Sequence, residues 1–227
     1  MPTATEARAS GFLKEALREI HIMAGLDPTS PAHQAETRKS LSVGVTSPDF
    51  GDGKTTVAIA LASSLAEDFS ASVTLVDADF HTHSVGREYG LQGQDGLSEV
   101  LAGNVTLQEV THRVTEAKMS VVTAGRTPSD PARMARSEHL TTLIENMKRA
   151  NEYVVIDLPA TLHSMNSPIL ANRCDGVVVV VRAGHTTKQD LERVLHLLKD
   201  SNVLGVVVNR RSSAVPEWVR RTLNLRG

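Results

Sequence analysis

The stretch with the clearest chemistry covers residues 43–56 and reads VGVTSPDFGDGKTT. An apolar segment typical of a buried strand leads into a glycine-containing turn, and Lys54 then opens a segment with a helical pattern. Glycines bring backbone N–H groups close to a ligand, and the N-terminus of a helix favours a phosphate. In a phosphate loop the lysine reaches the β- and γ-phosphates, and the hydroxyl that follows it holds Mg²⁺. The sequence therefore predicts a nucleotide-phosphate site made by Gly51, Asp52, Gly53, Lys54, Thr55 and Thr56.

This loop departs from the standard motif at one position. The usual pattern has a glycine six residues before the lysine, and Pro48 stands there. A short glycine–lysine–threonine run also fits an ordinary strand-to-helix turn with a threonine starting the helix. The assignment therefore depends on what the rest of the chain places beside Lys54.

Acidic and amide side chains follow several of the predicted strands. Asp77 and Asp79 come after residues 73–76, Asp157 after residues 153–156, and Asn209 after residues 203–208. In an open parallel sheet, ligands bind outside the carboxyl ends of the strands, and Mg²⁺ prefers oxygen ligands. We expect Asp157 to serve the metal, directly or through water. Asp77 or Asp79 could hold the ion or accept a proton from an attacking hydroxyl.

The elements that must position these residues alternate along the chain. Strands are predicted at residues 41–46, 73–76, 119–123, 153–156, 176–181 and 203–208, and helices at 12–23, 55–67, 97–102, 107–110, 138–150, 187–200 and 215–223. Strands such as GVVVVV are apolar on both faces, which indicates a parallel sheet that is covered on both sides. The predicted fold is α/β: a mostly parallel central sheet flanked by helices on both faces, as in the P-loop NTPases.

Length and composition exclude several classes of protein. The 227 residues carry a net charge of −2, so nothing favours nucleic acid or an anionic membrane as a partner. No apolar run reaches the roughly 20 residues that span a bilayer, and no secretion signal is evident. The single Cys174 suits a reducing cytosol, so we expect a cytoplasmic protein. His81 and His83 have no third partner at zinc-ligand spacing. We expect residues 1–40 to form a helix and connector, and residues 41–227 one nucleotide-binding domain.

The chain resembles a known family, the bacterial tyrosine kinases of capsule and exopolysaccharide export. These kinases belong to the same P-loop superfamily as the septum-positioning and plasmid-partition ATPases. The resemblance is carried by VTSPDFGDGKTTVAIALASSLA, TLVDADFHTHSVGREYGL, EYVVIDLPA, DGVVVVVRAGHTTKQDL and LGVVVNR. The family also lacks the first glycine of the usual phosphate loop, which accounts for Pro48.

The resemblance implies ATP and Mg²⁺ as cofactors and Mg-ATP-dependent phosphoryl transfer as the activity. Lys54, Asp77 and Asp79 would be catalytic, and Thr55, Asp77 and Asp157 would serve the metal. Asn209 would contact the adenine base. The implied role is a protein-tyrosine kinase-like ATPase that regulates polysaccharide polymerisation and export together with a transmembrane co-polymerase or adaptor. Contact with the membrane, at its inner face, would then come only through that partner.

Departures from the family's pattern leave an alternative open. The first helix resembles the family's subunit-contact helix at Glu15 and Arg18, with His21 in place of a second arginine, so we expect a homo-oligomer. In the family an aspartate pair, here Asp77 and Asp79, is usually followed by an arginine, and His81 stands in its place. The family's terminal tyrosine cluster has no counterpart, since the chain has two tyrosines, Tyr89 and Tyr153. The alternative is a nucleotide-dependent switch of the septum-positioning or partition type, although the lysine usual early in a partition ATPase's loop is missing.

Overall fold

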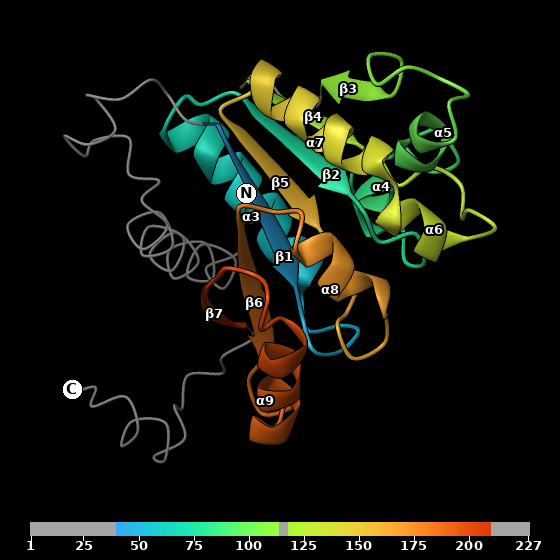
Figure 1. Cartoon of the computed structure of the whole chain (residues 1–227). Helices are drawn as coiled ribbons and strands as arrows, with labels where there is room; N and C mark the ends of the chain where they lie inside the picture. The colour runs from blue at the N-terminus through green and yellow to red at the C-terminus, as the bar shows by residue number, and fades with distance from the viewer. Residues whose placement is uncertain (1–39, 114–117, 210–227) are drawn as a thin grey trace.

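The computed structural model describes residues 40–113 and 118–209. These residues form a seven-stranded sheet in the order β3-β4-β2-β5-β1-β6-β7 (Figure 1). All neighbours pair in parallel except β3 with β4, which are antiparallel. The strands are β1 (Leu41–Thr46), β2 (Val73–Asp77), β3 (Thr111–Arg113), β4 (Met119–Val122), β5 (Tyr153–Asp157), β6 (Gly176–Arg182) and β7 (Val203–Asn209).

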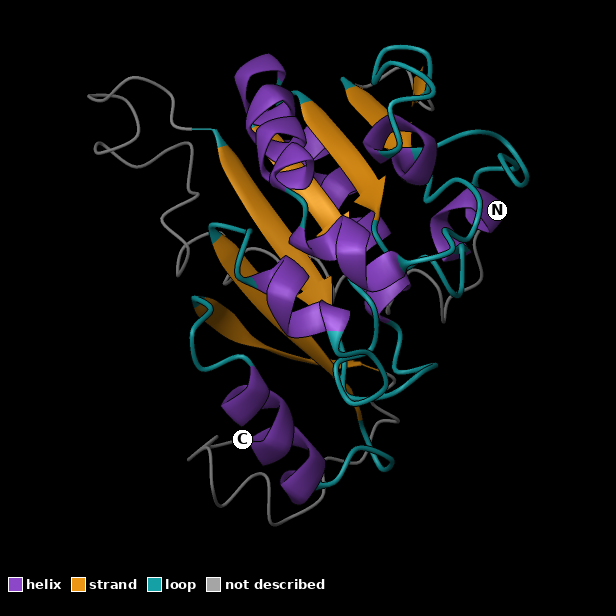
Figure 2. Ribbon diagram, turned by 45° about the vertical axis from the view of Figure 1, so that its right-hand side comes forward, coloured by secondary structure: helices purple, strands orange, loops and turns teal. Residues whose placement is uncertain are grey.

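Helices cover both faces of this sheet. In Figure 1, α7 and α8 lie in front of the strands and α3 behind them, and Figure 2 shows the molecule turned by 45° about the vertical axis. Because side chains alternate along a strand, β5 sends Tyr153 and Val155 into the core under α3, and Val154 and Ile156 into the opposite core. The helices are α3 (Lys54–Asp68), α4 (Ser84–Glu88), α5 (Leu97–Leu101), α6 (Pro131–Arg136), α7 (Glu138–Ala150), α8 (Asn166–Ala171) and α9 (Lys188–Leu197).

The predicted fold class is confirmed, and most elements lie where the sequence pattern indicated. One prediction was wrong: residues 107–110 were expected to form a short helix, but they form a turn that leads into β3. The Thr111 hydroxyl closes this turn by donating to the Leu107 carbonyl at 2.6 Å. Helices α4, α6 and α8 and strand β3 were not predicted. The predicted helices at residues 12–23 and 215–223, and so nearly all of segment 1–40, lie outside the described residues.

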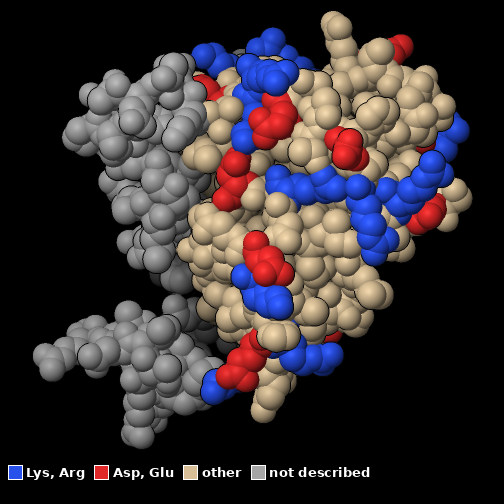
Figure 3. Space-filling view, in the orientation of Figure 1, with Lys and Arg blue, Asp and Glu red and all other residues tan. Residues whose placement is uncertain are grey.

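Two further sequence expectations concern the chemistry of the surface and of the single thiol. Among the described residues, no helix is both long and apolar enough to cross a membrane. Figure 3 shows lysines and arginines interspersed with acidic side chains on the face seen in Figure 1. Burial raises the pKa of the Cys174 thiol to about 12, so this thiol stays protonated at neutral pH, as expected for a residue that only packs.

Candidate phosphate-binding site

The loop between β1 and α3 has the backbone that a phosphate site needs. Gly51 and Gly53 have φ values of 77° and 98°, in the left-handed region that glycine adopts without strain. The Asp49 amide donates to Asp52 Oδ2 at 3.0 Å, which closes the turn. From β7, the Asn209 side-chain amide donates to the Asp52 carbonyl at 2.9 Å. The loop is therefore supported at its base, and Gly53 leads directly into the first turn of α3.

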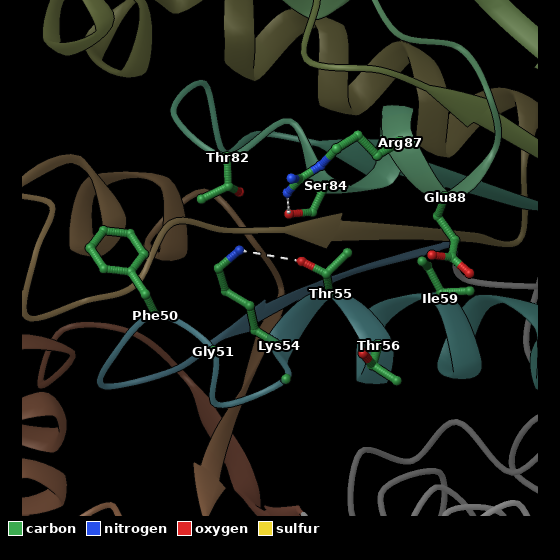
Figure 4. A pocket seen from close by; sticks show the side chains of 11 residues that line it. Phe50, Gly51, Lys54, Thr55, Thr56, Ile59, Thr82, Ser84, Arg87 and Glu88 are labelled. Atoms are coloured by element: carbon green, nitrogen blue, oxygen red, sulfur yellow. Dashed lines mark hydrogen bonds between the residues drawn. The ribbon is translucent and has the colours of Figure 1, made fainter. Parts of the chain in front are cut away.

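A buried ionic cluster lies at the start of α3. Lys54 Nζ is 2.9 Å from Asp79 Oδ2 and 3.5 Å from Asp157 Oδ1. The Thr55 hydroxyl donates to Asp157 Oδ2 at 2.6 Å, and Lys54 Nζ lies 3.4 Å from Thr55 Oγ1 (Figure 4). The structure thus brings together four residues that the sequence placed at the ends of three different elements.

Asp77 belongs to the same cluster but has a different set of contacts. Its Oδ1 accepts from the Asp79 amide at 3.0 Å, and its Oδ2 accepts from the Val85 amide at 3.1 Å. It pairs in register with Asp157 on the neighbouring strand. Both carboxylate oxygens of Asp77 therefore accept hydrogen bonds from backbone amides, and the residue connects α4 to the end of β2.

Burial and charge set the protonation of the cluster. Burial raises the pKa of Asp77 to about 8, helped by the Asp157 charge, and burial raises the pKa of Asp157 to about 6. Burial would also raise the pKa of Asp79, but the Lys54 ammonium outweighs it and lowers that pKa. For Lys54, the Asp157 and Asp79 charges outweigh burial, so its pKa is raised. Lys54 and Asp79 form the charged pair at neutral pH.

A pocket of about 480 Å³ opens above this cluster, between the loop and α4 (Figure 4). Of the residues predicted from sequence, Gly51, Gly53, Lys54, Thr55 and Thr56 line it. Asp52, Asp77, Asp79, Asp157 and Asn209 do not, and the three acids of the cluster are fully buried. Its remaining walls, which the sequence reasoning missed, are Phe50, Ile59, Thr82, Ser84, Arg87 and Glu88. Four of them, Thr82, Ser84, Arg87 and Glu88, follow closely after Asp77 and Asp79, and that position was the signal that could have found them.

The donors in the cluster suit a magnesium ion. Asp157 Oδ1 is buried, accepts no hydrogen bond and has Lys54 as its ionic neighbour, and Thr55 Oγ1 is a hard oxygen beside it. The described residues contain no group of three or more histidine, cysteine or acidic side chains arranged to hold a metal. Mg²⁺ usually keeps several waters and takes only one or two carboxylates together with substrate phosphates, so the residues present fit it.

Known proteins match this chain over most of its length. A family model described as an AAA domain matches residues 45–203. The tyrosine-protein kinase YwqD of Bacillus subtilis is 30% identical over 174 residues, which cover 76% of this chain and 73% of that protein.

Solved structures agree in fold. The VpsO kinase domain superposes with a TM-score of 0.72 at 28% identity, covering 87% of this chain and 98% of that one. The septum site-determining protein MinD of Pyrococcus horikoshii, complexed with Mg-ADP, superposes with a TM-score of 0.66 at 22% identity, covering 80% of this chain and 76% of that one. The chain therefore belongs to the AAA-domain family of P-loop ATPases, in the branch of the bacterial tyrosine-protein kinases.

Proposed function

We propose that this chain binds Mg-ATP in the pocket above Lys54 and transfers its γ-phosphoryl group. It would act as a protein-tyrosine kinase-like ATPase that regulates the polymerisation and export of an exopolysaccharide or capsule. One observation carries the proposal. Lys54 and Thr55 stand at the start of the long helix α3 and line the pocket. Asp79 and Asp157, which follow or end the neighbouring strands β2 and β5, hold these two side chains in place.

The residues of the chain have distinct tasks in this reaction. The loop amides around Gly53 and the Lys54 ammonium bind the phosphate oxygens, which stabilises the charge that develops during transfer. Thr55 and Asp157 are the residues that would hold a magnesium ion, which would help to neutralise the charge of the phosphates. Asp77 or Asp79 would orient the attacking hydroxyl. Asp79 stays ionised beside Lys54, and both acids accept backbone amides in this structure, Asp79 from His81 and Asp77 from Val85.

The first test is the substitution Lys54→Met, which keeps the volume of the side chain and removes its charge. We expect ATP turnover to fall by about 10²- to 10³-fold, the scale for loss of one preorganised charge-stabilising group. Calorimetry with Mg-ATP and phosphate-release kinetics measure it. Lys188→Ala is the control, because this lysine is exposed on α9 and pairs there with Glu192 at 3.3 Å. Turnover at the wild-type rate in the Lys54 variant contradicts the proposal.

The second candidate function is a nucleotide-dependent switch of the septum-positioning or partition type, without a phosphorylated protein. The two tyrosines favour it, because neither is an open acceptor. Tyr153 is 4% exposed within β5, and the pKa of the half-buried Tyr89 is raised by burial despite a side-chain hydrogen bond with Ser63. Labelled Mg-ATP with a synthetic tyrosine copolymer separates the two. Label on added tyrosine supports the kinase, and free phosphate alone supports the switch.

The partners belong to the same proposal. A transmembrane polysaccharide co-polymerase or adaptor would recruit the chain from the cytoplasm to the inner face of the membrane. We also propose a homo-oligomer, with the segment 1–40 as its contact. Light scattering with and without Mg-ATP, on the full chain and on a variant lacking residues 1–40, tests the assembly.

A further inference from the structure

Arg87 is the cation of the pocket wall that no described carboxylate neutralises. The pocket is lined by two basic residues, Lys54 and Arg87. Lys54 is held by Asp79 and Asp157. The Arg87 guanidinium donates to the Ser84 hydroxyl at 3.1 Å. In Figure 4 it reaches from α4 toward the space that Lys54 and Thr55 border from below.

The base of this arginine is fixed although its side chain is exposed. The Val85 amide donates to the buried Asp77, and the Val85 side chain is fully buried in the core under α3. The Leu91 amide donates to the Gly86 carbonyl at 2.8 Å, which closes the segment after α4. Arg87 therefore projects from a backbone that Asp77 attaches to the end of β2, next to Asp79 and its lysine.

The charge around the pocket leaves a role for a second cation. Lys54 is offset by two acids, and Glu88 adds a negative side chain at the pocket wall. A nucleoside triphosphate bound in the pocket would add further negative charge beside Lys54. A guanidinium presents a planar fork that matches phosphate oxygens and stays charged at any working pH. His81, where the resemblance leads one to expect an arginine, does not line the pocket, and its backbone amide donates to Asp79.

We propose that Arg87 binds the γ-phosphoryl oxygens of ATP and stabilises them during transfer, which rests on the function proposed above. In that step the bond between the γ-phosphorus and the β,γ-bridging oxygen breaks, and a bond to the acceptor oxygen forms. The acceptor gives its proton to solvent water, and ADP leaves with the electron pair of the broken bond. Arg87 keeps all its protons and contributes charge and orientation only. It would leave Ser84 for the phosphate when the triphosphate enters.

The test compares two nucleotides that differ in the γ-phosphate, the non-hydrolysable analogue AMP-PNP and ADP, each with Mg²⁺. In Arg87→Ala we expect AMP-PNP binding to weaken about 10- to 100-fold, the worth of a charge-assisted hydrogen-bonded contact. ADP affinity should stay close to that of the wild type. The rate constant kcat for phosphate release should fall about 10²- to 10³-fold. Arg87→Lys keeps the charge without the fork and should be intermediate.

Arg133→Ala is the matched control. Arg133 is exposed, lies on the short helix α6 and does not line the pocket. Thermal melting of each variant reports the fold, and Arg87→Gln gives a second neutral variant. Equal weakening of AMP-PNP and ADP, or unchanged binding of both, overturns the role of Arg87 alone. So does an effect confined to the KM of an added tyrosine substrate. A wild-type chain that binds neither nucleotide overturns this inference and the proposed function together.

Discussion

At the scale of single residues, the two glycines of the phosphate loop serve different purposes. Both have left-handed backbone angles, which cost an ordinary residue about 1–2 kcal/mol. A Cβ added at Gly51 would meet nothing within 4 Å. One added at Gly53 would lie 1.9 Å from Asn209 Nδ2, so the Asn209 side chain would have to give up its bond to the Asp52 carbonyl. Gly53 is therefore constrained by packing as well as by conformation.

Gly53→Ala should consequently be worse than Gly51→Ala. We expect it to lower the free energy of unfolding by about 1 kcal/mol more, for the lost Asn209 hydrogen bond. Because the amides beside the phosphate shift with Asn209, its Mg-ATP affinity should fall at least about tenfold, or about 1.4 kcal/mol. Urea denaturation and calorimetry on the two variants measure these differences. Equal stability and affinity for both would mean that Asn209 does not support the loop.

How well the site could be predicted also differs from residue to residue. Lys54, Thr55, Asp79 and Asp157 could be found because each stands at the end of an apolar strand or the start of a helix. The two hydrogen bonds that the Asp77 oxygens accept from backbone amides could not be predicted, because they depend on the turn between β2 and α4. Arg87 lies in a five-residue helix with no pattern to mark the side that faces the pocket.

At the scale of elements, Asp175 connects two strands and a helix at the edge opposite the phosphate loop. Its Oδ2 accepts from the Ser42 amide at 2.7 Å and from the Ser42 hydroxyl at 2.8 Å, which joins the start of β1 to the residue before β6. Lys148 of α7 lies 2.9 Å from the same carboxylate. Burial would raise the pKa of Asp175, but the Ser42 amide and Lys148 outweigh it, so the pKa is lowered.

Asp175→Asn should therefore destabilise the fold, by about 1 kcal/mol because the carboxylate is partly exposed. A carboxyl whose pKa is lower in the folded chain stabilises it above the unfolded pKa, about 3.9 for aspartate. That contribution is lost as the pH falls through the folded pKa. The difference in the free energy of unfolding between the variant and the wild type should thus be constant between about pH 5 and 8, and it should shrink below about pH 4. Urea denaturation across this range measures it, with the exposed Asp200→Asn as control. A difference that does not change with pH would exclude the carboxylate charge as its source.

Length accounts for most of the elements that the sequence did not indicate, although the five-residue α5 was predicted, at residues 97–102. The 13-residue helix α7 was predicted at its actual bounds, since its buried Leu140, Leu143, Ile144 and Met147 repeat with helical spacing. Helices α4, α6 and α8 have five or six residues, less than two turns, so no period can develop. Strand β3 has three residues and no fully buried side chain, and only its pairing with β4 defines it.

At the scale of the whole molecule, the sheet order brings distant segments to one edge. Strand β5 lies between β1 and β2, which places Asp157 beside the loop after β1 and opposite Asp77. A nucleotide bound there would contact the start of α3 and the segment after β2 at once. Unfolding separates these elements and destroys the site, so a ligand that binds there stabilises only the folded chain.

Mg-ATP should therefore raise the melting temperature of the wild-type chain. At a free concentration of about 100 times Kd the gain is about 2.7 kcal/mol. For a chain of this size each kcal/mol raises Tm by about 2–4 °C, which gives roughly 5–11 °C. The Lys54→Met variant will have its own baseline, because Asp79 and Asp157 lose their partner, and only its shift on adding Mg-ATP is compared. That shift should be near zero. An equal shift in both chains would mean that the nucleotide binds away from Lys54. If the melting temperature of the wild type does not shift, the pocket above Lys54 is not a nucleotide site.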